Sequence, residues 1–176
     1  MDSLFVRGCD RLYLACIWLA GLAIFLMSLI IPYGVFMRYV LGTGSAWPEP
    51  IAILFMMVFT FIGAAAAYRA GGHIAVNMLT DHLPRPLQRF AAVVVDLLML
   101  LVCAFVVWYG SRLCMETWGQ SISELSWLPV GLTYAALPIG AAATLVFVVE
   151  RMVCGPQTGR DVVRFEELPD NPEGAR

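Results

Sequence analysis

Histidine and cysteine, the side chains that most often bind metals, are few in this 176-residue chain, which has two histidines and five cysteines. His73 and His82 are nine residues apart, so they lie on different faces of any helix, and no cysteine stands near them to complete a metal site. The cysteines form no C-x-x-C pair, and the sequence contains no G-x-S-x-G, H-E-x-x-H or Walker pattern. We therefore expect no catalytic residue, no cofactor and no metal.

Asp96 is the one ionisable residue that interrupts a long apolar run. An aspartate near the centre of a bilayer costs about 2.5–3.5 kcal/mol, so a partner, water or protonation must offset that cost. Ion coupling and a polar clasp between helices are both compatible with its position. No second acid or base is expected at the same depth, so a proton relay would have no next carrier, and the clasp is favoured.

Arg38 and Glu49 stand on either side of a short segment, 41–49, that is rich in glycine and serine. They could form an ion pair that closes this loop, or they could be two independently solvated charges. A half-exposed pair of this kind contributes only about 0.2–1 kcal/mol. The neighbouring Trp47 is typical of the aromatic residues that lie at a membrane–water interface.

Small residues recur in two of the apolar runs. Gly63 and Ala67 are spaced as a small-xxx-small face, and so are Gly140 and Thr144. Faces of this kind let the backbones of two membrane helices approach closely. We therefore expect Gly63 to lie at a close contact between helices.

The elements that position these residues follow from composition. The chain is 60% hydrophobic and 14% charged, with a mean hydropathy of +0.78, whereas soluble domains are about 45–50% apolar and 25% charged. A helix needs about 20 apolar residues to cross a bilayer, and four runs reach that length. We expect spans at about 12–37, 50–69, 87–110 and 128–150. The sequence thus predicts an all-α integral membrane four-helix bundle.

Arginine placement predicts the orientation of the bundle. With the N-terminus inside, nine arginines fall on the inner side, and only Arg38 and Arg112 fall outside. Both termini are therefore expected in the cytoplasm of a multi-pass membrane protein. The inner segment 71–88 is expected to contain a short amphipathic helix lying in the membrane interface. Residues 1–153 would form the transmembrane domain, followed by a mobile cytoplasmic tail at 154–176. The net charge of −2 gives no reason to expect nucleic acid as a partner.

The stretch from Arg38 to Asn77 carries a family resemblance. It reads R-Y-V-L-G-T-G-S-A-W-P-E-P and then G-A-A-A-A-Y-R-A-G-G-H-I-A-V-N, and the fourth span adds W-x-P…Y…L-P-I-G. These motifs resemble the small membrane subunit of tripartite ATP-independent periplasmic (TRAP) transporters. The matching positions include Arg38, Trp47, Glu49, Gly63, Arg69 and His73. Two positions depart from the family pattern: Pro50 and Asn77 stand where the family usually has acids.

The resemblance implies a scaffold subunit in a bacterial inner membrane. A large membrane subunit would bind substrate and sodium and move as an elevator, and a periplasmic binding protein would deliver an organic acid. The small subunit would contribute no catalysis, only contacts with its partners and with the lipid bilayer. On this interpretation Arg38, Trp47, Glu49, Gly63, Arg69, His73 and Asp96 are candidate partner or scaffold contacts.

Two other functions were weighed against this scaffold. A stand-alone small exporter would use Asp96 as its ion-coupling residue. A haem-carrying membrane anchor of a redox enzyme would need axial histidines inside the spans, and both histidines lie outside them. The residues themselves therefore favour a scaffold over an exporter, and an exporter over a redox anchor.

Overall fold

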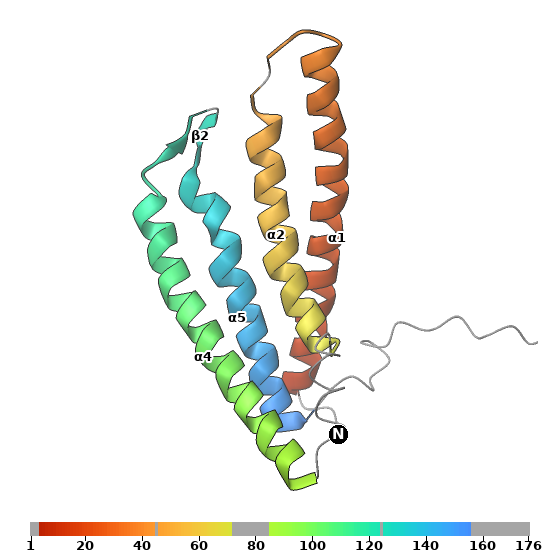
Figure 1. Cartoon of the computed structure of the whole chain (residues 1–176), viewed down its shortest axis with the longest axis vertical. Helices are drawn as coiled ribbons and strands as arrows, with labels where there is room; N and C mark the ends of the chain where they lie inside the picture. Colours follow the sequence, from red (N-terminus) through yellow and green to blue (C-terminus); the bar gives the residue numbers. More distant parts are fainter. Residues whose placement is uncertain (1–3, 45, 72–84, 124, 156–176) are drawn as a thin grey trace, which may run out of the picture.

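The computed structural model describes residues 4–44, 46–71, 85–123 and 125–155. Within these ranges the chain forms four long helices: α1 (Leu4–Tyr39), α2 (Pro48–Arg69), α4 (Arg85–Thr117) and α5 (Val130–Cys154) (Figure 1). All four are long and apolar enough to cross a membrane. The expected all-α membrane bundle is therefore confirmed. The segment expected to form an interfacial helix lies largely outside the described residues, as does the tail from residue 156.

The helices extend beyond the apolar runs that predicted them. α1 begins at Leu4 rather than near residue 12, and α4 continues to Thr117 rather than ending near residue 110. Because a helix needs no hydrocarbon around it once packing supports it, polar residues flanking an apolar run continue the same helix. Only α2, with 22 residues, closely matches the bilayer: its length of about 33 Å compares with a hydrocarbon core of about 30 Å.

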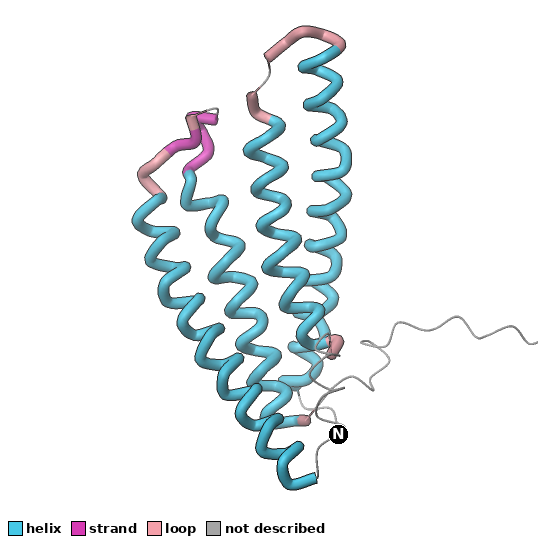
Figure 2. Tube along the Cα trace, viewed as in Figure 1, coloured by secondary structure: helices cyan, strands magenta, loops and turns pink. Residues whose placement is uncertain are grey.

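The bundle consists of two antiparallel pairs. α1 packs on α2, α4 packs on α5, and the contact between α2 and α5 joins the pairs (Figures 1 and 2). α1 begins and α5 ends at the same end of the bundle, which we name the terminal end. At the opposite end, which we name the hairpin end, β1 (Ser121–Ile122) pairs antiparallel with β2 (Leu125–Pro129). The sequence analysis did not predict this small hairpin.

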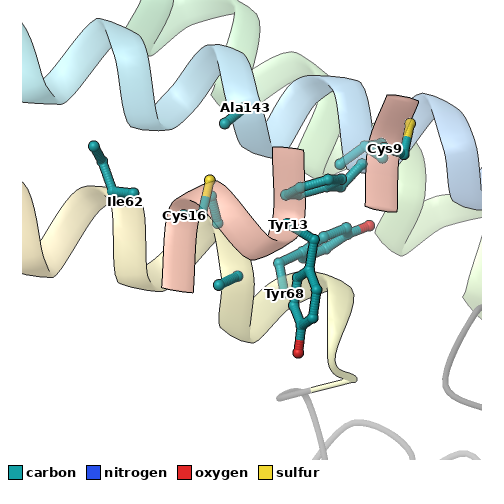
Figure 3. Close-up of a cluster of buried hydrophobic side chains, with 10 residues drawn as sticks. Cys9, Tyr13, Cys16, Ile62, Tyr68 and Ala143 are labelled. Atoms are coloured by element: carbon teal, nitrogen blue, oxygen red, sulfur yellow. The ribbon is translucent and has the colours of Figure 1, made fainter. Parts of the chain in front are cut away.

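The core lies toward the terminal end. It joins side chains from α1, α2 and α5, including Tyr13, Ala65 and Phe147, each at most 1% exposed (Figure 3). The buried residues of α1 all lie between Val6 and Ala23, and none follows Ala23. Toward the hairpin end α1 still meets α2 at the buried Pro48, but it contributes no buried residue of its own.

Large apolar side chains remain on the outer surface of the bundle. On α1, Trp18 is 78% exposed, and on α4, Trp108 is 62% exposed. In water such surfaces would be an aggregation hazard, whereas lipid tails or the apolar face of another membrane protein would cover them. The exposed surface is thus as apolar as expected for a protein that lies in a membrane.

Candidate functional site: ion pairs that join the four helices

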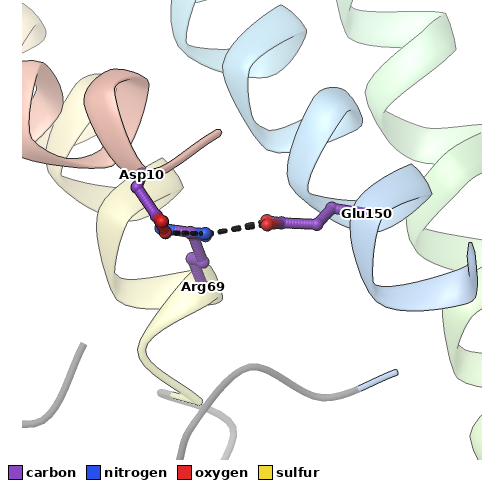
Figure 4. Close-up of polar contacts among 3 residues, drawn as sticks. All are labelled: Asp10, Arg69 and Glu150. Atoms are coloured by element: carbon purple, nitrogen blue, oxygen red, sulfur yellow. Dashed lines mark hydrogen bonds and ion pairs between the residues drawn. The ribbon is translucent and has the colours of Figure 1, made fainter. Parts of the chain in front are cut away.

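Arg69, the last residue of α2, lies inside the bundle. Its side chain is 1% exposed, and it contacts carboxylates from two other helices (Figure 4). Nε and Nη2 donate to the two carboxylate oxygens of Glu150 on α5 at 2.8 and 2.7 Å. Nη2 also donates to Oδ1 of Asp10 on α1 at 2.6 Å. One guanidinium therefore ties α1, α2 and α5 together.

Aromatic rings surround the same guanidinium. Its Cζ lies 5.3 Å from the ring centre of Tyr13 and 5.4 Å from that of Phe147. Nη1 has no hydrogen-bond partner among the described residues, but it belongs to a cation flanked by two π-systems, an arrangement that is itself stabilising. Arginine suits this position because its planar, weakly hydrated cation can form a two-pronged contact and stack at once.

Asp96 of α4 also has a partner. Its Oδ1 lies 3.3 Å from Nε of Arg151 on α5, next to Glu150 in sequence. The contact is an ion pair without hydrogen-bond geometry, because this oxygen is buried and has no hydrogen-bond partner among the described residues. Arg151 also lies over the ring of Tyr68, at 6.0 Å. The two ion-pair groups together connect all four helices at the terminal end.

The position of Asp96 corrects one premise of the sequence analysis. A basic partner was not expected at its depth, yet Arg151 reaches it because α5 continues to Cys154. Since Glu150 is adjacent to Arg151 and pairs with the final residue of α2, Asp96 lies near the terminal boundary of the spans. Asp10 and Glu150 were missed altogether, because charges at the ends of apolar runs were treated as boundaries.

The remaining candidate residues lie elsewhere. Arg38 Nη2 and Glu49 Oε2 are 3.6 Å apart at the hairpin end, and their side chains are 57% and 74% exposed. The two residues therefore form a long, solvated ion pair and are not independent charges. The ring of Trp47 lies beside that of Tyr33, with centres 5.7 Å apart. His73 lies outside the described residues. Within the described part of the chain, no group of three histidine, cysteine or acidic side chains is arranged to hold a metal ion.

Gly63 is not the close contact that the small-residue pattern indicated. A Cβ added there would meet only Ala20, at an ordinary 3.7 Å. At Gly140 of α5, by contrast, an added Cβ would lie 2.6 Å from the backbone oxygen of Phe61 on α2. A close approach between the two helix pairs, of α5 to α2, therefore depends on Gly140.

The fold and the ion pairs define a four-span helical membrane protein in which the buried charges of the described residues are paired with one another. Residues 27–157 match the family described as tripartite ATP-independent periplasmic transporters, DctQ component. Because this match covers most of the sequence, the chain belongs to that family, as the motifs around Arg38 and Arg69 indicated.

Three relatives extend the comparison. A putative TRAP transporter small permease protein of Haemophilus influenzae is 27% identical over 128 residues, which cover 73% of this chain and 79% of the relative. The ectoine TRAP transporter small permease protein TeaB of Halomonas elongata is 25% identical, over 70% of this chain and 65% of that protein. The sialic acid TRAP transporter permease protein SiaT of Haemophilus influenzae is 24% identical over 81% of this chain but only 23% of its own length.

Replacing Asp96 with asparagine tests the role of the second ion pair. We expect uptake by the assembled transporter to persist at least in part, since asparagine leaves no buried carboxylate and the side chain of Arg151 is 29% exposed to solvent. Arg151→Gln is the matched control, and a clasp predicts similar, modest losses for both variants. Complete loss of uptake in Asp96→Asn alone, with the complex still assembled, would instead favour ion coupling by this carboxylate.

Proposed function

We propose that this protein is the small scaffold subunit of a TRAP-type secondary transporter. It would support a large, sodium-coupled elevator subunit that imports an organic acid delivered by a periplasmic binding protein. The observation that carries this proposal is the internal pairing of Asp10, Arg69 and Glu150, together with the apolar exposed faces of α1 and α4. The described residues of such a bundle provide apolar faces for a partner subunit and form no polar path for a solute.

The relatives support a large partner and a substrate site on another chain. In SiaT, the region similar to this chain makes up about a quarter of one longer permease protein. Relatives of comparable similarity are named for different solutes, sialic acid and ectoine. This chain is about equally similar to both relatives, as is expected if another chain selects the solute. The solute is therefore proposed to bind in the large subunit and in the binding protein.

Both termini are proposed to face the cytoplasm of a bacterial inner membrane. Arg7 and Arg11 are exposed near the start of α1, and Arg151 lies near the end of α5, so the terminal end carries the positive charges expected inside. On this orientation Arg38, Trp47 and Glu49 face the periplasm. His73 and the segment around it would lie at the cytoplasmic interface. A reporter enzyme that is active only in the cytoplasm should be active when fused to either terminus. A reporter that is active only in the periplasm should be inactive at both positions.

The outer loop at Trp47 is proposed as a contact for the large subunit or the binding protein. Truncating an exposed aromatic anchor at an interface typically costs 1–2 kcal/mol or more. We therefore expect Trp47→Ala to reduce co-purification or uptake about tenfold. Trp118→Ala, which removes another exposed tryptophan from the same end of the bundle, is the control. Unchanged pull-down and uptake in the Trp47 variant would remove this site.

Reconstitution tests the function as a whole. Liposomes that contain this chain, the large subunit and the binding protein should accumulate an organic acid when a sodium gradient is applied. Omitting any one component should abolish uptake. Solute movement by this chain alone would contradict the scaffold role and favour a stand-alone exporter.

A further inference from the structure

An apolar groove with a volume of about 330 Å³ lies between α1 and α2 in the half of the bundle near the hairpin end. Its walls are Met27, Ile31 and Val35 on one side and Ala52 and Met56 on the other. At Gly34, the absent side chain lets Pro48 pack directly on α1, since an added Cβ would lie 3.0 Å from the proline ring. The two helices thus meet at Gly34 and Pro48, and the open groove lies beside this contact.

The groove has about the length of one membrane leaflet. Its apolar α1 wall runs from Met27 to Val35, about 12 Å along a helix axis, and Arg38 follows one turn further on. Half of the hydrocarbon core of a bilayer is about 15 Å thick. A groove of this length, oriented along the spans, is matched by a single acyl chain.

Two opposite charges stand at the mouth of the groove. Arg38 and Glu49 both line it, and their charged atoms are 3.6 Å apart and mostly exposed. So long and solvated a pair contributes little by itself, and both groups remain available to a ligand. The rings of Tyr33 and Trp47 lie together at the same end, where aromatic side chains in membrane proteins meet lipid headgroups.

We propose that this groove binds one phospholipid with a zwitterionic ethanolamine headgroup. One of its two acyl chains would lie against Met27, Ile31 and Val35, and the other would stay in the bilayer. The phosphate would accept hydrogen bonds from Arg38, and the ammonium would pair with Glu49. Phosphatidylglycerol, which has the phosphate and no ammonium, satisfies only Arg38. The bound lipid would fill the groove that α1 and α2 leave between them.

Native mass spectrometry tests this proposal on the full chain, purified in mild detergent with its accompanying subunits. The sample is equilibrated with equal amounts of phosphatidylethanolamine and phosphatidylglycerol of identical acyl chains. We expect the ethanolamine lipid to be retained roughly fivefold more than the glycerol lipid. Glu49→Gln should abolish this preference, and Arg38→Gln should reduce retention of both lipids. Glu116→Gln and Arg112→Gln, at exposed positions on α4, are the charge-matched controls.

A variant that fills the groove shows how much the acyl-chain contact contributes to lipid retention, separately from the headgroup contacts. Ala52→Phe should displace the lipid, whereas Ala15→Phe, at an exposed position of α1 outside the groove, should not. Equal retention of both lipids by the unmodified chain, or undiminished retention in Ala52→Phe, would overturn the proposal. So would a photocrosslink from Ile31 to another polypeptide, which would place protein in the groove. None of these measurements requires uptake, so they stand apart from the transport assay.

Discussion

Arg69→Gln is expected to lower the free energy of unfolding by about 3–5 kcal/mol. The glutamine removes the guanidinium that both Asp10 and Glu150 contact, and the side chain of Glu150 is 1% exposed. An uncompensated buried carboxylate costs far more than the pair contributed, because burial removes its hydration. Since most proteins are stable by only about 5–15 kcal/mol, we expect a much smaller monodisperse fraction in detergent and a lower unfolding temperature.

A matched set of variants shows whether the cost comes from unpaired charge. Arg112→Gln removes an exposed arginine of α4 and should change stability by less than about 0.5 kcal/mol. The triple change Asp10→Asn, Arg69→Met and Glu150→Met removes all three charges together and should recover most of the lost stability, because apolar replacements of buried ion pairs are often neutral. An unfolding temperature for Arg69→Gln equal to that of Arg112→Gln would mean that the triad is not buried in the protein.

The number and type of spans were predictable from the sequence because one local property determines them. A bilayer admits a helix only where about 20 apolar residues follow one another, and the runs around residues 12–37 and 128–150 satisfy this without knowledge of any contact. The hairpin at Ser121–Pro129 had no such signal, since its two strands are short and its register is interrupted by a bulge. Turns and short strands depend on the helices they connect.

The ion pairs could not be predicted in the same way because they depend on which helices are neighbours. Arg69 and Glu150 are 81 residues apart, and Asp10 and Arg69 are 59 residues apart. A usable signal was nevertheless present. In a bundle of antiparallel spans, the start of α1 and the ends of α2 and α5 must lie at the same end, so Asp10, Arg69 and Glu150 were candidates for pairing. The sequence analysis used these charges only to delimit spans.

Gly140 shows a related limit of sequence patterns. The sequence contains two small-xxx-small faces, and the pattern alone does not say which of them touches a neighbouring backbone, because this depends on how each helix is rotated about its axis. In the structure α5 presents Gly140 directly to the backbone of Phe61, whereas Gly63 of α2 has ordinary clearance from Ala20. The close approach joins the two helix pairs, so its loss would affect the whole bundle.

Gly140→Leu is accordingly expected to have the second largest effect. The first added carbon already lies 2.6 Å from a backbone oxygen that cannot move without displacing α2. Overpacking a core usually lowers the free energy of unfolding by about 1–3 kcal/mol. Because the neighbour of Gly140 is backbone, we expect even Gly140→Ala to fall in the upper part of that range. Gly140→Leu should cost more. We expect both variants to lower the unfolding temperature in detergent and to reduce co-purification of the partner subunit.

Three alanine variants measured together make this prediction specific. Gly21 of α1 has nothing within 4 Å of an added Cβ, Gly63 has one contact at 3.7 Å, and Gly140 has backbone atoms at 2.6 Å. Because alanine favours helices over glycine by about 0.5–1 kcal/mol, Gly21→Ala and Gly63→Ala should be neutral or stabilising. Only Gly140→Ala should be destabilising. If Gly63→Ala lowers the unfolding temperature as much as Gly140→Ala does, then α1 and α2 pack more tightly at Gly63 than its clearance from Ala20 indicates, and Gly140 is not the more constrained of the two glycines.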